Sequence, residues 1–170
     1  MRMEVPRSID NCNSMFERLR VYKATLLLES EVRQLIRHIK CDRNLLDQLL
    51  RAVLSVKLNV AESAGYRFNG KKILAYEIAR ASSDETRAAL NELVARGYAT
   101  EKQIQRAISL TRVIAKMLTG MIRKVETEMR SRKTETEKRS RKTETEKRSR
   151  KTKQRSEAQL RSGKSNADPG

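Results

Sequence analysis

Cations that recur along one side of a predicted helix are the residues of this chain best suited to contact a ligand. Arg112, Lys116 and Arg123 are spaced by four and seven residues within a segment of helical apolar period. On a helix they fall within about 40° of one another and roughly 140° from the centre of the apolar stripe. Such a row can engage phosphates and release their counterions. The candidate nucleic-acid-binding residues are Arg67, Lys71, Lys72, Arg80, Arg87, Arg112, Lys116, Arg123 and Lys124.

Part of this charge has a second interpretation, as a solvated face with ion pairs inside one helix. Arg80 and Arg87 share a helix face, and Asp84 precedes Arg87 by three residues. Glu92 precedes Arg96 by four residues. Exposed pairs contribute only about 0–1 kcal/mol to stability, yet they reduce the charge that is offered to a polyanion. The later helix favours phosphate binding, whereas around Arg80 and Arg87 both interpretations stay open.

Four polar residues fall on largely apolar or small-residue faces of the predicted helices: Asn59, Glu62, Ser82 and Glu85. The two carboxylates are a candidate acid/base or metal pair. A di-metal bundle, however, brings Glu-x-x-His motifs from facing helices, and the single histidine, His38, supplies none. We therefore expect that the protein is not an enzyme and that it binds no metal and no cofactor. The four are predicted to be buried structural groups that fix helix register or a subunit contact, so Glu85→Gln is expected to change stability or assembly.

Cysteine usage and hydropathy predict a cytoplasmic protein without a membrane partner. Cys12 and Cys41 lie far apart with no CxxC spacing, so no disulfide framework is indicated. His38 and Cys41, three residues apart, offer two metal ligands where a structural zinc site needs four. The first ten residues contain no apolar signal-peptide core, and no stretch approaches the length of a membrane span.

The positive charge divides between a domain and a low-complexity tail. The chain has 170 residues, with 38 Lys/Arg, 21 Asp/Glu and a net charge of +17, which attracts polyanions at long range. Residues 129–170 hold 15 Lys/Arg and 6 Asp/Glu, a net of +9, which leaves +8 for residues 1–128. The tail has too few apolar residues to offset the entropy of ordering. We expect an N-terminal arm at 1–13, a helical bundle at 14–126 and a basic tail at 127–170.

The tail repeats a nine-residue unit, RSRKTETEK, at 130–138 and 139–147, and the unit decays from residue 148. A period of nine residues rotates by about 900° on a helix, so successive copies point to opposite sides and build no single face. Glu135 and Arg139, like the same pair one copy later, are spaced to support a helix. The tail is predicted to be disordered, with a frayed continuation of the last helix as the alternative.

Two amphipathic segments with the helical period occupy the first half of the domain. The first is predicted at 14–40, where Ser14 and Glu17 form a capping box at its start. The second is predicted at 44–64 and is apolar nearly all round, since Leu54 and Leu58 widen its stripe. A helix of that kind is buried on more than one side.

Two further segments complete the domain. The third helix is predicted at 71–96 and ends at Gly97, a natural residue for the turn after a helix. The fourth opens at Thr100, where Gln103 completes a capping box. Four helices with short links predict an all-α fold, an antiparallel up-down four-helix bundle.

The small and polar residues of this domain resemble those of a known family, the four-helix-bundle proteins of ribosomal-RNA intervening sequences. The same family includes the accessory variability determinants of diversity-generating retroelements. The resemblance covers about 16–124. It rests on the run Asn59-Val60-Ala61-Glu62, on Gly65 and Arg67, on Ile78-Ala79 with Ser82 and Glu85, and on Ala95-Arg96-Gly97-Tyr98.

The resemblance implies an up-down bundle that assembles as a ring-shaped homopentamer. For the retroelement branch it also implies binding of RNA or DNA and of a partner reverse transcriptase. No catalytic residues come with the family. Two functions are therefore expected: a nucleic-acid-binding accessory protein of a retroelement, or a structural or protein-interaction bundle of the ribosomal-RNA branch.

Overall fold

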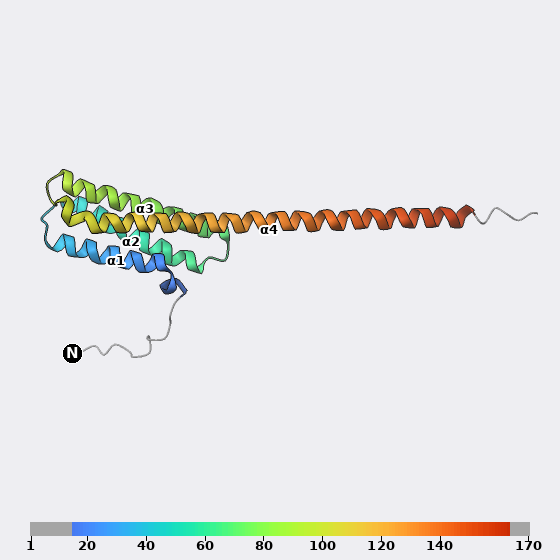
Figure 1. The fold of residues 1–170 in the computed structure, drawn as a ribbon, viewed down its shortest axis with the longest axis horizontal. Helices are drawn as coiled ribbons and strands as arrows, with labels where there is room; N and C mark the ends of the chain where they lie inside the picture. The colour runs from blue at the N-terminus through green and yellow to red at the C-terminus, as the bar shows by residue number, and fades with distance from the viewer. Residues whose placement is uncertain (1–14, 164–170) are drawn as a thin grey trace, which may run out of the picture. The chain divides into compact units, whose positions relative to one another are not determined.

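A computed structural model describes residues 15–163, and this part of the chain contains helices and no strand. The predicted all-α up-down bundle is confirmed (Figure 1). By internal packing the chain forms two units, Met1–Glu126 and Thr127–Gly170. Helix α4 runs through both. The elements are the 3-10 turn η1 (Met15–Arg18) and the helices α1 (Arg20–Arg37), α2 (Arg43–Gly65), α3 (Asn69–Ala95) and α4 (Glu101–Gly163).

The first helix is shorter at both ends than the sequence predicted. A 3-10 turn precedes it, and Leu19 is extended, with φ −70° and ψ 124° and no side-chain cap. Ser14 of the predicted capping box lies outside the described residues. At the other end the amide of His38 bonds to the carbonyl of Leu35 in a tighter final turn. Asp42 then caps α2 through the amide of Asn44, at 2.8 Å, so the chain must leave the helical path before it.

The bundle core is built from the stripes that face inward on the four helices. The largest fully buried apolar side chains come from all of them, and α2 lies between α1 and α3 in the packing. Burial of each such side chain contributes about 1.5–3 kcal/mol. These residues are Leu28 and Val32 of α1, Leu49, Val56 and Val60 of α2, Leu90 and Leu93 of α3, and Ile114 and Leu118 of α4.

The prediction that the second helix is buried on more than one side is wrong for the single chain. Leu54 and Leu58 of α2 remain 46% and 48% exposed, because the core lies on the opposite side of the helix. Leu26 of α1 is likewise 44% exposed. These side chains form apolar ridges on the outside of the bundle.

The link between α3 and α4 folds as the local sequence predicts. Gly97 has φ +75°, its amide bonds to Val94, and the amide of Tyr98 bonds to Leu93 at 2.8 Å. This pattern of two bonds closes the end of α3 around a residue with positive φ. Three residues later Thr100 and Gln103 form the predicted capping box: the Gln103 side chain accepts from the Thr100 amide at 2.8 Å. The exit of α3 and the entry of α4 are thus both fixed.

The second unit consists, in its described part, of the α4 segment 127–163. Of the two interpretations of the tail, this segment follows the helical one. Its side chains are exposed from residue 127 to residue 152. The Glu and Arg residues spaced four apart in the repeat form ion pairs, Glu135 with Arg139 at 3.1 Å and Glu144 with Arg148 at 3.3 Å. Each such pair stabilises a helix by about 0.3–0.5 kcal/mol.

Candidate nucleic-acid interface

A buried hydrogen bond sets the register of α3 against α4. The hydroxyl of Ser83 donates to the carbonyl oxygen of Thr111 at 3.1 Å, and both residues are buried. The two helices run in opposite directions (Figure 1). Residues that precede Ser83 therefore lie level with residues that follow Thr111. This places Arg80 at the level of the helical turn between Arg112 and Lys116.

The predicted row on α4 is exposed throughout. Arg112, Lys116 and Arg123 all present their side chains to solvent. Arg112 and Lys116 have no carboxylate partner within the described residues, in contrast to Arg106, which pairs with Glu31 at 3.1 Å. The row flanks the side of α4 that meets α3, since Thr111, the residue before Arg112, bonds to Ser83 of α3. We call Arg80, Arg87, Arg112, Lys116 and Arg123 the α3–α4 basic surface.

The two predicted arginines of α3 differ in whether they have an ion-pair partner. Arg87 pairs with Asp84 at 2.8 Å, as the spacing suggested. Arg80 is exposed and has no carboxylate partner in the described part of the chain. The second ion pair that the spacing suggested also forms, between Arg96 and Glu92 at 2.7 Å. Arg80 therefore adds a charge to the α3–α4 basic surface, while much of the Arg87 charge is balanced locally.

The three cations of the turn between α2 and α3 lie at the level of one end of this surface. Arg67 and Lys71 are exposed, Lys72 is half-buried, and the Lys71 ammonium lies 5.9 Å from the centre of the Tyr66 ring. Lys72 precedes Ser83 by as many residues as Ile122 follows Thr111, so the turn is level with Arg123. The register thus brings the turn cations level with the Arg123 end of the α3–α4 basic surface.

Lys124, the ninth predicted cation, lies elsewhere. It borders a cleft between the start of α1 and α4, together with Arg18 and Arg20. Sequence reasoning missed this cleft, because the pairing of α1 with α4 carries no local signal.

The four polar residues predicted to be buried behave in two ways. Ser82 is buried and shares a hydrogen bond of 2.8 Å with Ser55 of α2, and the half-buried Asn59 donates to the Ser55 carbonyl at 2.9 Å. Glu62 and Glu85 are exposed in the single chain, so they do not fix helix register within it, and the alternative role in a subunit contact stays a prediction. Glu62 accepts from Tyr66 at 3.3 Å at the end of α2. Of these bonds, the one between Ser55 and Ser82 joins α2 to α3 and fixes their register, whereas the Asn59 bond lies within α2.

The described residues offer no group of three or more His, Cys, Asp or Glu side chains placed to hold a metal. Cys41 is a free, half-buried thiol, and burial raises its pKa. Cys12 lies outside the described residues. No helix within 15–163 is long and apolar enough to cross a membrane.

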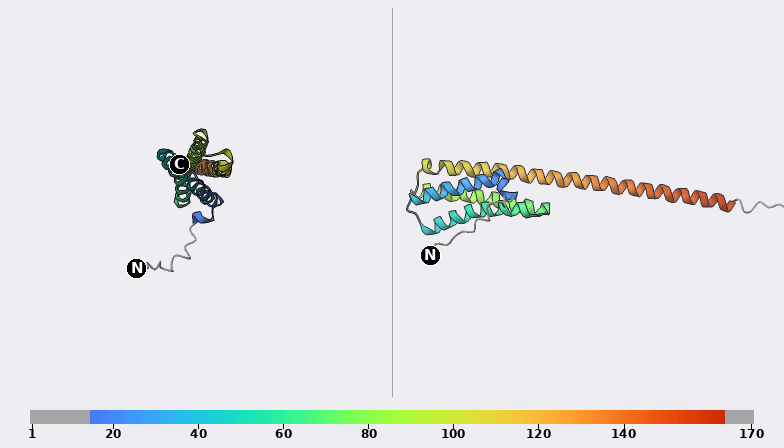
Figure 2. Two further views of the ribbon diagram at one scale, coloured as in Figure 1. Left: turned by 90° about the vertical axis from the view of Figure 1, so that its left-hand side faces the viewer. Right: turned by 90° about the horizontal axis from the view of Figure 1, so that it is seen from below.

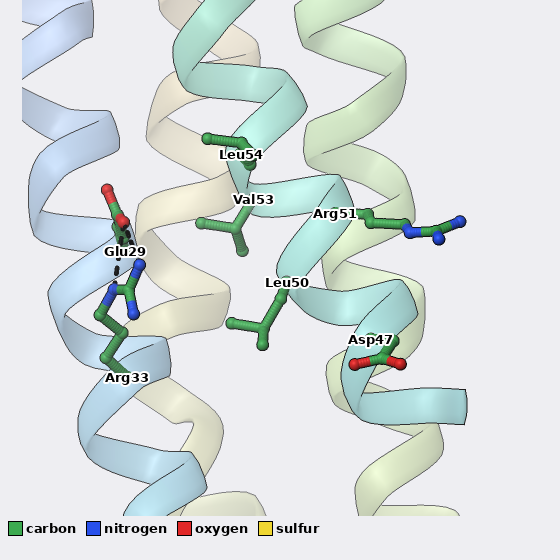
Figure 3. Close-up of a pocket in the computed structure, with 7 residues that line it drawn as sticks. All are labelled: Glu29, Arg33, Asp47, Leu50, Arg51, Val53 and Leu54. Atoms are coloured by element: carbon green, nitrogen blue, oxygen red, sulfur yellow. Dashed lines mark hydrogen bonds and ion pairs between the residues drawn. The ribbon is translucent and has the colours of Figure 1, made fainter. Parts of the chain in front are cut away.

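An ion pair between α1 and α2 was also missed. Glu29 accepts from Lys57 at 2.6 Å and from Arg33 at 2.8 Å, and the Glu29 and Lys57 side chains are only 18% and 20% exposed. Figure 3 shows Glu29 and Arg33 together beside Leu50 and Val53, on the wall of a cleft between the two helices. The hydrogen bond from Lys57 lowers the pKa of Glu29, and desolvation opposes it in part.

This pair predicts a pH-dependent contribution to stability. Because the folded pKa of Glu29 lies below its ordinary value of 4.5, the contribution is complete above that pH and is lost as the pH falls through the lowered pKa. Lys57→Met should lower the free energy of unfolding by about 1–2 kcal/mol near neutral pH, and by much less near pH 3. Urea unfolding at both pH values measures the difference.

Arg33→Met is the matched control for this experiment. Arg33 bonds to the same carboxylate, but its side chain is 60% exposed, so its loss should matter less. A Lys57→Met deficit that is as large near pH 3 as near neutrality would contradict the ion-pair explanation.

Comparisons with known proteins agree with this fold. The model of the 23S rRNA-intervening sequence protein family matches residues 17–120. A crystal structure of a protein of unknown function from the S23 ribosomal protein family of Bacteroides thetaiotaomicron superposes with a TM-score of 0.56 at 23% identity. The match covers 60% of this chain and 97% of that one, and it speaks for the fold alone. No curated protein matches the chain. The family match, over more than half of the sequence, establishes that the chain belongs to the 23S rRNA-intervening sequence protein family.

Proposed function

We propose that this protein is a non-enzymatic nucleic-acid-binding protein of the cytoplasm that acts as a homo-oligomer. The observation that carries the proposal is the α3–α4 basic surface, where Arg80, Arg112 and Lys116 lie at one level without carboxylate partners in the described residues. Cations on a protein wall concentrate phosphate, and each phosphate contact releases counterions. The helical tail segment 127–163 adds basic blocks that grip phosphates without reading sequence.

The test is a titration of the full chain with duplex RNA and with duplex DNA of the same sequence, across a series of salt concentrations. We expect the logarithm of the association constant to fall steeply with the logarithm of salt, with a slope of about −0.9 for each phosphate contacted in a B-form duplex. A shallow slope, or no binding at low salt, would reject the proposal. The family name gives RNA as the first ligand to try.

Self-association is supported by apolar side chains on the outside of α2 and α3. The hydrogen bond between Ser55 and Ser82 sets the register of these helices, and it places Leu58 level with Ile78. Leu58 and Ile78 are 48% and 42% exposed, and Leu74, one turn before Ile78, is 56% exposed. Contiguous apolar surface of this kind is typical of protein interfaces.

The resemblance noted in the sequence gives the assembly as a pentamer. Size-exclusion chromatography with light scattering measures it, and a monomer at all concentrations would contradict self-association. The same surface is what the alternative function, a structural or protein-interaction bundle, would use. In that case the oligomer would form while nucleic acid failed to bind.

The retroelement part of the resemblance extends the proposal to a reverse transcriptase as partner. It rests on the sequence resemblance and on the basic charge, which would attract the nucleic acid held by such an enzyme. Co-purification of a co-expressed reverse transcriptase after nuclease treatment tests it. Loss of the enzyme on nuclease treatment would reject a direct contact.

A further inference from the structure

A cleft with an apolar floor and a cationic rim lies where the start of α1 meets α4. Leu19, Val21, Met117 and Met121 form its floor, and Gly120 contributes no side chain. The ion pair of Arg106 with Glu31 sets the register of the two helices and brings Met117 level with the first turn of α1. The cleft has a volume of about 560 Å³, within the range of about 300–1,000 Å³ that small-molecule sites occupy.

The rim of the cleft carries three cations: Arg18, Arg20 and Lys124. All three are exposed, and none has an ion-pair partner among residues 15–163. An apolar wall beside unpaired cations strengthens their field, because low-dielectric surroundings screen charge poorly. The chemistry of the cleft thus matches a ligand with an anionic group attached to a flat or apolar body.

The cleft adjoins the α3–α4 basic surface. Gly120 follows Lys116 by one turn of α4, so the two positions are neighbours on the surface of the helix. A nucleic acid whose backbone lies on the basic surface would carry its next nucleotides toward the cleft. An unpaired nucleotide supplies both features of the expected ligand, a phosphate for the rim and a base for the floor.

We propose that this cleft binds an unpaired nucleotide that is splayed out of an RNA duplex, with the phosphate at Arg18, Arg20 and Lys124 and the base on Met117 and Met121. Thioether sulfur makes favourable contacts with aromatic rings, so two methionines substitute for the aromatic platforms of other RNA-binding proteins. Specific RNA recognition commonly targets such bulged or looped nucleotides. The inference rests on the proposed nucleic-acid binding and names the feature of the RNA that is recognised.

The experiment compares two labelled RNA hairpins, one fully paired and one with a single unpaired uridine in the stem. Fluorescence anisotropy with the full chain should show about fivefold tighter binding of the bulged hairpin. Gly120→Leu should abolish that preference and leave the affinity for the paired hairpin unchanged. A Cβ atom at Gly120 meets nothing within 4 Å, so a side chain has room there, and because Gly120 lines the cleft we expect the Leu side chain to occupy it.

Gly120→Ala is the matched control, because a methyl group leaves the cleft open and the preference should persist. Arg18→Gln with Arg20→Gln is an independent variant that should reduce the preference through the rim. Equal binding of both hairpins by the wild-type chain would overturn the inference while the proposed function stands. An equal loss for both hairpins in Gly120→Leu, or a changed oligomer mass, would also overturn it, the latter by assigning the cleft to a second copy. Binding of neither hairpin would instead reject the proposed function.

Discussion

Reversing two charges on α4, by Arg112→Glu with Lys116→Glu, should weaken binding of duplex RNA on the order of 100-fold at low salt, since two phosphate contacts are lost and two repulsions are added. Both side chains are exposed and lack carboxylate partners within 15–163, so the fold should not change. The slope of log K against log salt should also become shallower by about two. Circular dichroism would verify that the helices remain.

The control for this variant is an equal change of charge on another side of the bundle. Arg37→Glu with Arg51→Glu alters exposed side chains of α1 and α2 by the same amount. It changes the long-range attraction and leaves the α3–α4 basic surface intact, so a clearly smaller loss is expected. Equal losses in the two double variants would show that net charge alone governs binding and that the basic surface is not a site.

Deleting residues 129–170 should produce the second large effect. This segment carries 15 Lys/Arg and 6 Asp/Glu, and its removal should lower the affinity for any duplex on the order of 100-fold at low salt, with a shallower salt slope. The described part of this segment contributes no residue to the bundle core, whose last buried side chain is Ile122. Electrophoretic mobility shifts across a salt series would measure the change.

A full-length variant separates charge from length. Replacing the 15 Lys and Arg residues of 129–170 with Gln keeps the length of the chain and removes the phosphate-binding groups. If its loss of affinity matches that of the deletion, charge is responsible. Affinity that survives both changes would show that the tail has no part in nucleic-acid binding and that the bundle binds alone.

Local chemistry made some parts of this fold predictable. The positive φ at Gly97 and the reciprocal bonds of Thr100 and Gln103 depend on residues within one turn of each other, so a linear pattern contains all the information. The pairs at Glu135 and Glu144 are likewise local. The start of α1 was misplaced because nothing in the sequence separates a 3-10 turn at 15–18 from the first turn of an α-helix.

Contacts between helices could not be predicted from the sequence. The spacing of Arg112 and Lys116 predicted a row, but only the bond from Ser83 to Thr111 places Arg80 beside it. The carboxylate of Glu29 on α1 likewise pairs with Lys57 on α2, and the helical period of neither segment predicts this contact. The cation row could therefore be predicted from the sequence of one helix. The α3–α4 basic surface and the cleft between α1 and α4 could be identified only from the packing of the helices.

The exposure of Glu85 in the single chain has a specific cause. Helix α3 carries small residues on two sides: Ala75 and Ala79 are buried, whereas Ala81 and Ala88 are exposed. Glu85 lies on the same side as Ala81 and Ala88. Alanine suits both a close helix contact and a solvent face, so composition could not identify which of the two sides was inward.

The nine-residue repeat of the tail has a geometric consequence once it is helical. One copy adds about 13.5 Å to a helix and turns whatever follows by about half a revolution, whereas two copies restore the original direction after about five complete turns. Gain or loss of a copy would therefore alter both the reach and the facing of the residues beyond it, without touching the bundle. The number of copies therefore sets the length of the helical tail, and adding an odd rather than an even number of copies turns the residues beyond the repeats to the opposite side of the helix.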